Sequence, residues 1–308
     1  MKNLAMASVN PTTYELYSKQ LDTYRAFARE HGLDVSLPIS TKNLGLFLSS
    51  LYEKDKSYST IVGYVNAISY FHKLNCLPDP YDSEFIEKLL NGIKKLIPPS
   101  DKRKAIDLNK LELMLDYLPR LDLSCYDVTL YNAMFLFTYY GCLRVGEVAK
   151  ASNKDNVVSF DQLECKFVNG MIDSFVLRFI KFKHSDTVRN PRKQKSALPR
   201  MKFTKKQVKR FCPVRKMFRY LKIRGPKKGQ LFLKENGDGV TYHNFNSVMK
   251  KCILGVGLPE GSYGTHSFRI GRCTDLHNLG YTESQIKVLG RWKSGAFKNY
   301  IRPDVIQI

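Results

Sequence analysis

The sequence predicts a mainly α-helical protein with a small antiparallel β-sheet in the second of two domains. Apolar residues recur at helical spacing in the N-terminal part, strand-like patterns are confined to the middle of the chain, and a basic segment with two prolines separates the two helical regions. A chain of 308 residues is long enough for two hydrophobic cores. We therefore expect a helical N-terminal domain at 1–97, a linker at 98–106 and a second domain at 107–308.

Four helices are expected in the first domain, with no strand pattern between them. Gly32 fits the C-terminal cap of the first helix, and Ser40 and Thr41 are both possible N-terminal caps of the second. In the third helix Ile61, Val65 and Ile68 fall on one apolar stripe. The four expected helices span residues 11–33, 40–55, 57–77 and 83–97.

In the second domain, the spacing of the apolar residues changes twice along the chain. Helical spacing comes first, then alternating apolar and polar residues with many β-branched and aromatic side chains, and then helical spacing again. The expected helices span 108–119, 125–152, 213–225, 243–254, 267–280 and 282–290. The expected strands lie in 156–170 and 171–183, with 195–200 as a third.

Composition excludes several classes of protein. No run of eighteen apolar residues is present, and the N-terminus lacks the apolar core of a secretory signal, so we expect no membrane attachment. The seven cysteines are odd in number, widely spaced and without a CxxC pair. This pattern argues against a disulfide framework and a zinc cluster, and it favours a reducing compartment. We expect no metal and no cofactor.

The charge of the chain predicts a polyanionic partner. Lys and Arg number 50 against 28 Asp and Glu, and the segment 178–228 contains twenty Lys or Arg with Asp186 as its one acid. A solvated disordered tail would also be basic, but it would not need the phenylalanines and tyrosine interleaved here. We expect the following residues to contact DNA phosphates: Lys181, Arg192, Lys193, Lys195, Arg200, Lys205, Lys206, Lys209 and Arg210.

Two short motifs of the second domain supply candidate phosphate ligands. In "GCLRVGEV", Arg144 lies near the end of an apolar helix, and Glu147 is close enough to orient it, although a purely structural ion pair is an equal alternative. In "GTHSFRIGRCT", His266 and Arg269 are three residues apart and therefore share one face of a helix. Together these side chains could bind one phosphate.

A third motif, "LGRWKSGAFKNYIRP", supplies a candidate nucleophile. If two arginines and a histidine bind a phosphate, Tyr300 can attack its phosphorus, because guanidinium forks neutralise the charge that develops on the non-bridging oxygens. A covalent ester conserves the energy of the broken bond, so neither ATP nor a metal is required. Trp292 offers only an indole N–H and cannot act as a base.

The ordered set Arg144, His266-x-x-Arg269, Trp292 and Tyr300 resembles the tyrosine recombinase (phage-integrase-type) family, which carries Arg, Lys, His-x-x-Arg, His or Trp, and Tyr in this order. The stretches "CPVRKMFRYLKIRG", "THSFRIG" and "LGRWKSGAFKNYIR" resemble the branch encoded by eukaryotic mobile elements of the Crypton and DIRS type. "STIVGYVNAISYFHKL" and "LNGIKKLIPPSDKRKAI" resemble the N-terminal domain of that branch, so the resemblance covers about residues 12–303.

The resemblance implies an enzyme that cuts and rejoins DNA strands. Tyr300 would attack a DNA phosphodiester, form a 3′-phosphotyrosyl link and release a 5′-hydroxyl. Arg144 and Arg269 would hold the phosphate, and His266 would contact it and transfer protons. Trp292 would take the place where many members have a second histidine.

The catalytic lysine of the family normally lies in a turn between two strands and protonates the leaving oxygen. Lys183 is the expected counterpart, because it directly follows the strand-like "VLRFIKF". Lys181, Lys193 and Lys195 remain alternatives, and His184 or a water could substitute.

The resemblance also implies an assembly and a location. The helical core-binding domain and the catalytic domain would form a C-shaped clamp around double-stranded DNA. Four protomers would act on two duplexes as a homotetramer. A eukaryotic mobile element would act in the nucleus.

Three other classes of protein remain as alternatives. The first is a DNA-binding protein derived from such a recombinase without strand-exchange activity, which would share the basic surface but would not need Tyr300 in register with the arginines. The second is a nicking enzyme of the type IB topoisomerase kind, and the third is a metal-dependent nuclease. The nuclease would require clustered acids, and acids are scarce around these motifs.

Overall fold

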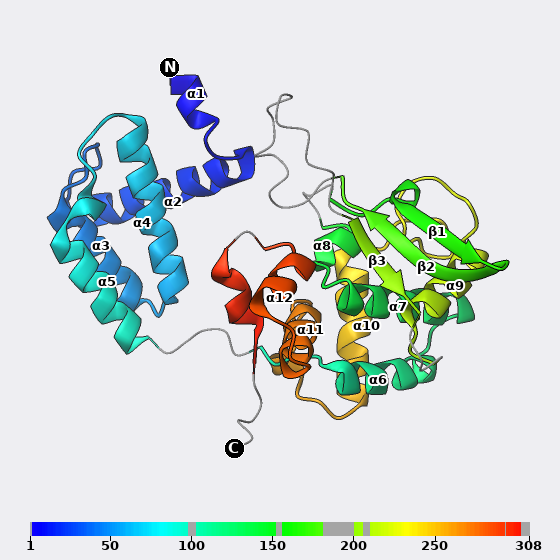
Figure 1. Ribbon diagram of the computed structural model, residues 1–308. Helices are drawn as coiled ribbons and strands as arrows, with labels where there is room; N and C mark the ends of the chain where they lie inside the picture. Colours follow the sequence, from blue (N-terminus) through cyan, green and yellow to red (C-terminus); the bar gives the residue numbers. More distant parts are fainter. Residues whose placement is uncertain are drawn as a thin grey trace. The chain divides into compact units, whose positions relative to one another are not determined.

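The computed structural model describes residues 2–97, 103–151, 156–180, 200–205, 210–292 and 294–302. The chain divides into two compact units, Met1–Lys102 and Arg103–Ile308 (Figure 1). The first unit therefore ends inside the expected linker 98–106. Within the described ranges, no helix is both long and apolar enough to cross a bilayer.

The first unit is helical, as predicted. The caps act as expected: the Ser40 hydroxyl accepts a hydrogen bond from the Asn43 backbone N–H, and Gly32 follows the first long helix with a positive φ of 63°. The Ile61, Val65 and Ile68 stripe is fully buried. The elements are α1 (Lys2–Met6), α2 (Pro11–Glu30), α3 (Thr41–Glu53), α4 (Tyr58–Leu74), a 3-10 turn η1 (Pro80–Asp82) and α5 (Glu84–Leu96).

The second unit combines helices with one small sheet, and the predicted fold class is confirmed. Its helices are α6 (Leu108–Tyr117), α7 (Cys125–Tyr140), α8 (Val145–Val148), α9 (Pro213–Arg224), α10 (Tyr242–Gly255), α11 (Ser267–Asn278) and α12 (Glu283–Leu289). Its 3-10 turns are η2 (Leu118–Arg120), η3 (Phe160–Gln162), η6 (Glu260–Ser262) and η7 (Gly295–Tyr300). Figure 1 shows α12 and η7, at the red end of the chain, beside α11.

The core of the second unit fixes α11 against two other helices. Phe135 of α7, Phe245 of α10 and Phe268 of α11 are fully buried, with ring centroids 5.2–5.7 Å apart. Such aromatic contacts are favourable beyond the area that they bury. The two residues that flank Phe268 on α11 within a turn, His266 and Arg269, are therefore held in place by the core.

The sheet has three antiparallel strands in the order β1 (Leu163–Val168), β2 (Met171–Arg178) and β3 (Arg200–Thr204). Of the predicted third strand at 195–200, residues 195–199 lie outside the described residues, Arg200 is in β3, and β3 continues to Thr204. In β3, Met201 and Phe203 face the core, whereas Arg200 and Lys202 are exposed. This alternation gives the strand one basic face.

The helix expected at 125–152 is interrupted after Tyr140. Cys142 has a positive φ of 45°, and the Leu143 backbone N–H returns to the carbonyl of Thr138, 2.9 Å away. These features end α7 in a tight turn, and α8 begins at Val145. Arg144 therefore lies in a turn between two helices, and the expectation that it is part of a long apolar helix is wrong.

Residues 103–106 of the expected linker pack against the second unit as an extended segment. The Lys104 N–H donates to the carbonyl of Ser262 at 2.7 Å, and the Ile106 N–H donates to that of Ser267 at 3.0 Å. Ile106 is fully buried, and its backbone lies directly against Gly271 of α11. This segment thus supports the start of the helix that carries Arg269.

Candidate active site

The turn between α7 and α8 presents Arg144 together with Glu147. The Glu147 carboxylate accepts a hydrogen bond from the Arg144 backbone N–H at 2.8 Å, and its other oxygen lies 3.5 Å from the Arg144 guanidinium. The Arg144 side chain is 23% exposed, while that of Glu147 is 4% exposed. Burial, and next the charge of Arg269, lower the pKa of Arg144. Arg144 therefore faces outward from a buried carboxylate.

Glu147 has a second and closer partner that the sequence analysis missed. Arg291, in the turn between α12 and η7, donates to the Glu147 carboxylate at 2.8 Å, and its side chain is 8% exposed. Its guanidinium lies 3.8 Å from the centroid of the Phe179 ring. Burial lowers the pKa of Arg291, and the nearby Glu147 opposes that shift. The one signal in the sequence was its position next to Trp292, because the contact spans 144 residues.

Arg269 lies almost fully buried in the first turn of α11. Its guanidinium donates to the carbonyl of Cys142 at 2.7 Å and to that of Gly290 at 3.2 Å. Cys142 is two residues before Arg144, and Gly290 is two residues before Trp292. Arg269 thus connects the turns that carry the other candidate residues.

Trp292 and Tyr300 pack around this arginine. The Arg269 guanidinium lies 4.4 Å from the Trp292 ring centroid and 5.5 Å from the Tyr300 ring centroid, and the two rings are 5.2 Å apart. Thr274 of α11 anchors the backbone around the tyrosine, because its hydroxyl accepts from the Arg302 N–H at 3.0 Å. Tyr300 is therefore held half-buried at the end of η7.

His266 occupies the N-cap position of α11, and its ring centroid is 6.3 Å from that of Tyr300. His266 and Arg269 share the first turn, as their spacing predicted. The structure thus brings together five of the six residues that the sequence singled out for catalysis: Arg144, His266, Arg269, Trp292 and Tyr300.

The arrangement has an excess of positive charge. The guanidiniums of Arg144 and Arg291 pair with the Glu147 carboxylate, and that of Arg269 lies near both of these arginines. In the described part of the chain, Nε of Arg269 and both Nε and Nη1 of Arg291 are buried without a hydrogen-bond partner. Unpaired buried donors are costly, and an anion is the partner that guanidiniums prefer. The chemistry of this cluster fits a phosphate group.

Two thiols lie beneath the arginines. Sγ of Cys142 is 3.7 Å from Sγ of Cys273 on α11, and both residues are fully buried and free. The hydrogen bond with Cys273, followed by the charge of Arg269, lowers the pKa of the Cys142 thiol to about 7. Among the described residues, His, Cys, Asp and Glu side chains do not gather in threes as a metal site requires.

Several expected residues lie outside the described residues, and nothing follows for them. These are Lys183 as the expected catalytic lysine, and Lys181, Arg192, Lys193, Lys195, Lys206 and Lys209 as expected DNA contacts. Of the remaining three, Arg200 and Lys205 are exposed in and beside β3. Arg210 is also exposed, but it pairs with Asp116 of α6 at 2.5 Å.

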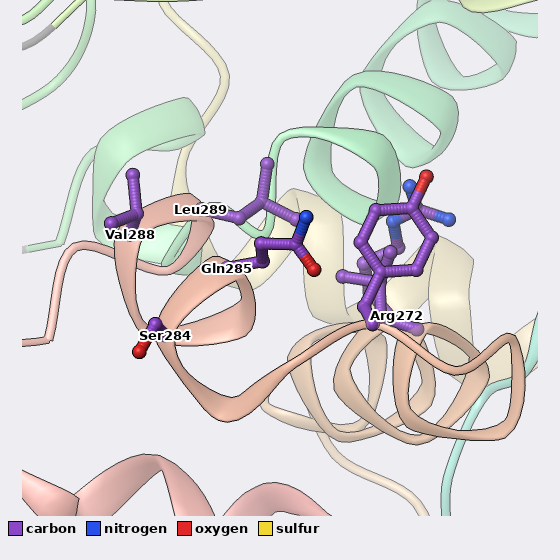
Figure 2. Close-up of a pocket in the computed structure, with 7 residues that line it drawn as sticks. Arg272, Ser284, Gln285, Val288 and Leu289 are labelled. Atoms are coloured by element: carbon purple, nitrogen blue, oxygen red, sulfur yellow. The ribbon is translucent and has the colours of Figure 1, made fainter.

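A pocket of about 470 Å³ lies between α11 and α12 (Figure 2). It is lined mostly by apolar atoms, and its lining residues are Arg272, Leu276, Tyr281, Ser284, Gln285, Val288 and Leu289. None of these belongs to the arginine cluster. The pocket therefore suits an apolar group.

Comparison with solved structures identifies the class of fold. A Tn1549 transposon integrase in complex with circular intermediate DNA aligns with a TM-score of 0.55 at 16% identity, covering 94% of this chain and 95% of that one. The XerH site-specific recombinase bound to palindromic difH substrate, in a post-cleavage complex, aligns with a TM-score of 0.61 at 15% identity, covering 95% and 76%.

A lambda integrase dimer bound to a COC′ core site aligns with a TM-score of 0.58 at 13% identity, covering 100% of this chain and 77% of that one. No family model and no curated protein matches the sequence. At these identities the shared property is the fold, and the fold of this chain is that of the tyrosine recombinases and integrases.

Proposed function

We propose that this protein is a site-specific DNA recombinase or integrase that cuts and rejoins strands through a 3′-phosphotyrosyl intermediate. The observation that carries the proposal is the packing of Tyr300 against Arg269 and Trp292, beside His266 and within the field of Arg144. A phenol beside converging guanidiniums and an imidazole is suited to phosphoryl transfer. A protein that only binds DNA does not need a phenol in this arrangement.

The proposed reaction exchanges one P–O bond for another. The Tyr300 oxygen attacks the scissile phosphorus and forms the new bond, while the bond to the 5′ oxygen breaks. Arg144 and Arg269 stabilise the charge on the non-bridging oxygens. His266 accepts or shares the phenol proton, and the leaving oxygen takes a proton from a lysine, with Lys183 as the expected donor, or from water. The reverse reaction with a second strand's 5′-hydroxyl completes rejoining.

The finer parts of the proposal are supported by the sequence. The stretches "THSFRIG" and "LGRWKSGAFKNYIR" support a recombinase of a Crypton- or DIRS-type mobile element that acts in a nucleus. On the same basis we propose that both units bind double-stranded DNA as a clamp and that a homotetramer acts on two duplexes. Because the phosphotyrosyl ester retains the free energy of the broken phosphodiester bond, the proposed reaction requires no ATP and no metal.

A covalent trap tests the proposal. The full chain is incubated with a duplex that carries a nick close to the cleavage site, so that the released fragment diffuses away and the adduct accumulates. The expected result is a protein–DNA adduct that forms in the presence of EDTA and that is absent in Tyr300→Phe. The substrate is a pool of nicked duplexes whose sequences are taken from the DNA that flanks the gene encoding this protein.

The trap also separates the alternatives. An adduct that persists in Tyr300→Phe would assign the nucleophile to another residue. Salt-sensitive DNA binding without any adduct would favour the derived DNA-binding protein.

A further inference from the structure

We propose that Arg291 is a positioning residue of the phosphate site. It holds the Glu147 carboxylate, so that the Arg144 guanidinium keeps its positive charge for the phosphate. This inference deepens the proposed function and rests on it. Arg291 lies within the motif "LGRWKSGAFKNYIRP", but it is not among the residues that led to that function.

The Glu147 carboxylate is bound more closely by the Arg291 guanidinium than by the Arg144 guanidinium. One Glu147 oxygen receives hydrogen bonds from the Arg291 guanidinium and from the Arg144 backbone N–H, both at 2.8 Å. The Arg144 guanidinium is 3.5 Å from the other oxygen, at the limit of a hydrogen bond. Glu147 therefore fixes the backbone of Arg144 while its charge is balanced mainly by Arg291.

The surroundings direct the Arg291 side chain toward Glu147, and Arg144 is the more exposed of the two guanidiniums. The Arg291 side chain is 8% exposed, against 23% for Arg144, and Phe179 covers one face of its guanidinium at 3.8 Å. The Arg291 backbone has a positive φ of 56°. The side chain of Arg291 contacts Glu147, whereas that of the next residue, Trp292, packs against Arg269. Arg291 and Trp292 thus diverge from one turn, one toward Glu147 and the other toward the nucleophile.

The charges explain why a third arginine is useful. With Arg291, three guanidiniums and one carboxylate leave a formal excess of two positive charges. A phosphodiester carries one negative charge, and the five-coordinate transition state of its displacement carries two. Without Arg291 the excess falls to one, and the freed carboxylate can turn fully to Arg144. An anion would then compete with Glu147 for that guanidinium.

The first test measures anion binding without requiring catalysis. Trp292 is the only tryptophan of the chain and stacks on Arg269, so its fluorescence reports on the site. Inorganic phosphate is titrated at constant ionic strength into the wild type and into Arg291→Met, Glu147→Gln and the double variant. We expect Arg291→Met to weaken binding about tenfold, and the double variant to regain most of the loss because no carboxylate remains to compete.

Arg291→Lys and Arg25→Met complete the set. Lysine keeps the charge but not the planar fork, so the expected loss is smaller than for Met. Arg25 pairs with Asp22 three residues away at 3.1 Å in the first compact unit, and its change to Met should leave phosphate binding unaltered. A purely structural ion pair predicts that the double variant binds phosphate no better than Arg291→Met. That result, equal binding by Arg291→Met and the wild type, or no phosphate response in the wild type, would overturn the inference.

The second test uses the rate of adduct formation at saturating nicked DNA. Arg291→Met should slow the chemical step more than it weakens DNA binding, and Glu147→Gln should restore part of the rate in the double variant. If the wild type forms no adduct, the proposed function fails while the phosphate titration still decides the role of Arg291. Circular dichroism melting of every variant separates these effects from unfolding. The double variant removes both members of the Arg291–Glu147 ion pair, so it remains informative if Arg291→Met is unstable.

Discussion

Asp275 of α11 is a half-buried carboxyl whose ionisation opposes folding. Its Oδ2 accepts hydrogen bonds from the Tyr139 hydroxyl and from the Leu108 backbone N–H, the latter at 2.8 Å. Burial outweighs these bonds and raises the pKa of Asp275. The same burial, followed by the charge of Asp275, raises the pKa of Tyr139. The pair lies at the junction of α7, α11 and the segment before α6.

The raised pKa gives a prediction for stability against pH. The folded state binds the Asp275 proton more tightly than the unfolded state, so this contribution is present below the ordinary carboxyl pKa and is lost as pH rises through the folded value. In Asp275→Asn the side chain stays neutral. We therefore expect the unfolding free energy of the wild type, relative to that of the variant, to fall as pH rises above the ordinary carboxyl pKa of 3.8 in urea unfolding experiments. A relative rise over that range would mean that the hydrogen bonds dominate over burial.

At the residue scale, the side-chain types of the candidate site were predictable from the sequence, but the ion pairs that connect them were not. Arg144, His266, Arg269 and Tyr300 could be proposed together because phosphoryl transfer requires these side-chain types. Arg291 escaped, since its meaning depends on a carboxylate distant in sequence.

At the element scale, α11 depends on a glycine that allows close backbone approach. A Cβ on Gly271 would lie 1.7 Å from the carbonyl oxygen of Ile106, where the chain enters the second unit. Because that oxygen belongs to backbone held by the Ile106–Ser267 hydrogen bond, it cannot move aside easily. The close approach fixes the turn of α11 that follows Arg269.

We expect Gly271→Ala to destabilise the second unit by about 1–3 kcal/mol, as overpacking typically does. The readout is urea unfolding followed by Trp292 fluorescence, since this tryptophan reports on the second unit alone. Gly92→Ala in α5 is the control and is followed by circular dichroism, because it lies in the first unit. A Cβ added there would meet no atom within 4 Å, and alanine favours a helix by up to about 1 kcal/mol. A Gly271→Ala protein as stable as the wild type would show that the 106–107 backbone yields freely.

The elements themselves were predictable where one face is clearly apolar, as in α4 and α9. The sequence failed at the α7–α8 break, because the apolar pattern continues through Cys142 while its backbone turns left-handed. It also did not predict residues 201–204 as a strand, since the alternation of β3 is short and lies within a basic segment where charge hides the period. Both features, the break after α7 and the position of β3, are determined by tertiary packing, against α11 and β2 respectively.

At the scale of the whole molecule, the charge is divided very unequally between the two units. Residues 1–102 contain 12 Lys or Arg and 11 Asp or Glu, whereas residues 103–308 contain 38 and 17. The first unit is therefore almost neutral, and nearly all of the net charge of +22 lies in the second. If the chain binds DNA as proposed, the release of counterions must come mainly from the second unit.

This division predicts how the salt dependence of DNA binding responds to substitution. Replacing Arg200 and Lys205 with Gln removes two exposed charges beside β3, and the slope of log affinity against log salt should become shallower by about 0.9 for each lost phosphate contact. The matched control, Lys54→Gln with Lys56→Gln, removes two exposed charges from the first unit and should leave the slope unchanged. The measurement is fluorescence anisotropy of a labelled duplex at several salt concentrations. Equal changes in both double variants would mean that the first unit neutralises as many phosphates as the second, despite its charge balance.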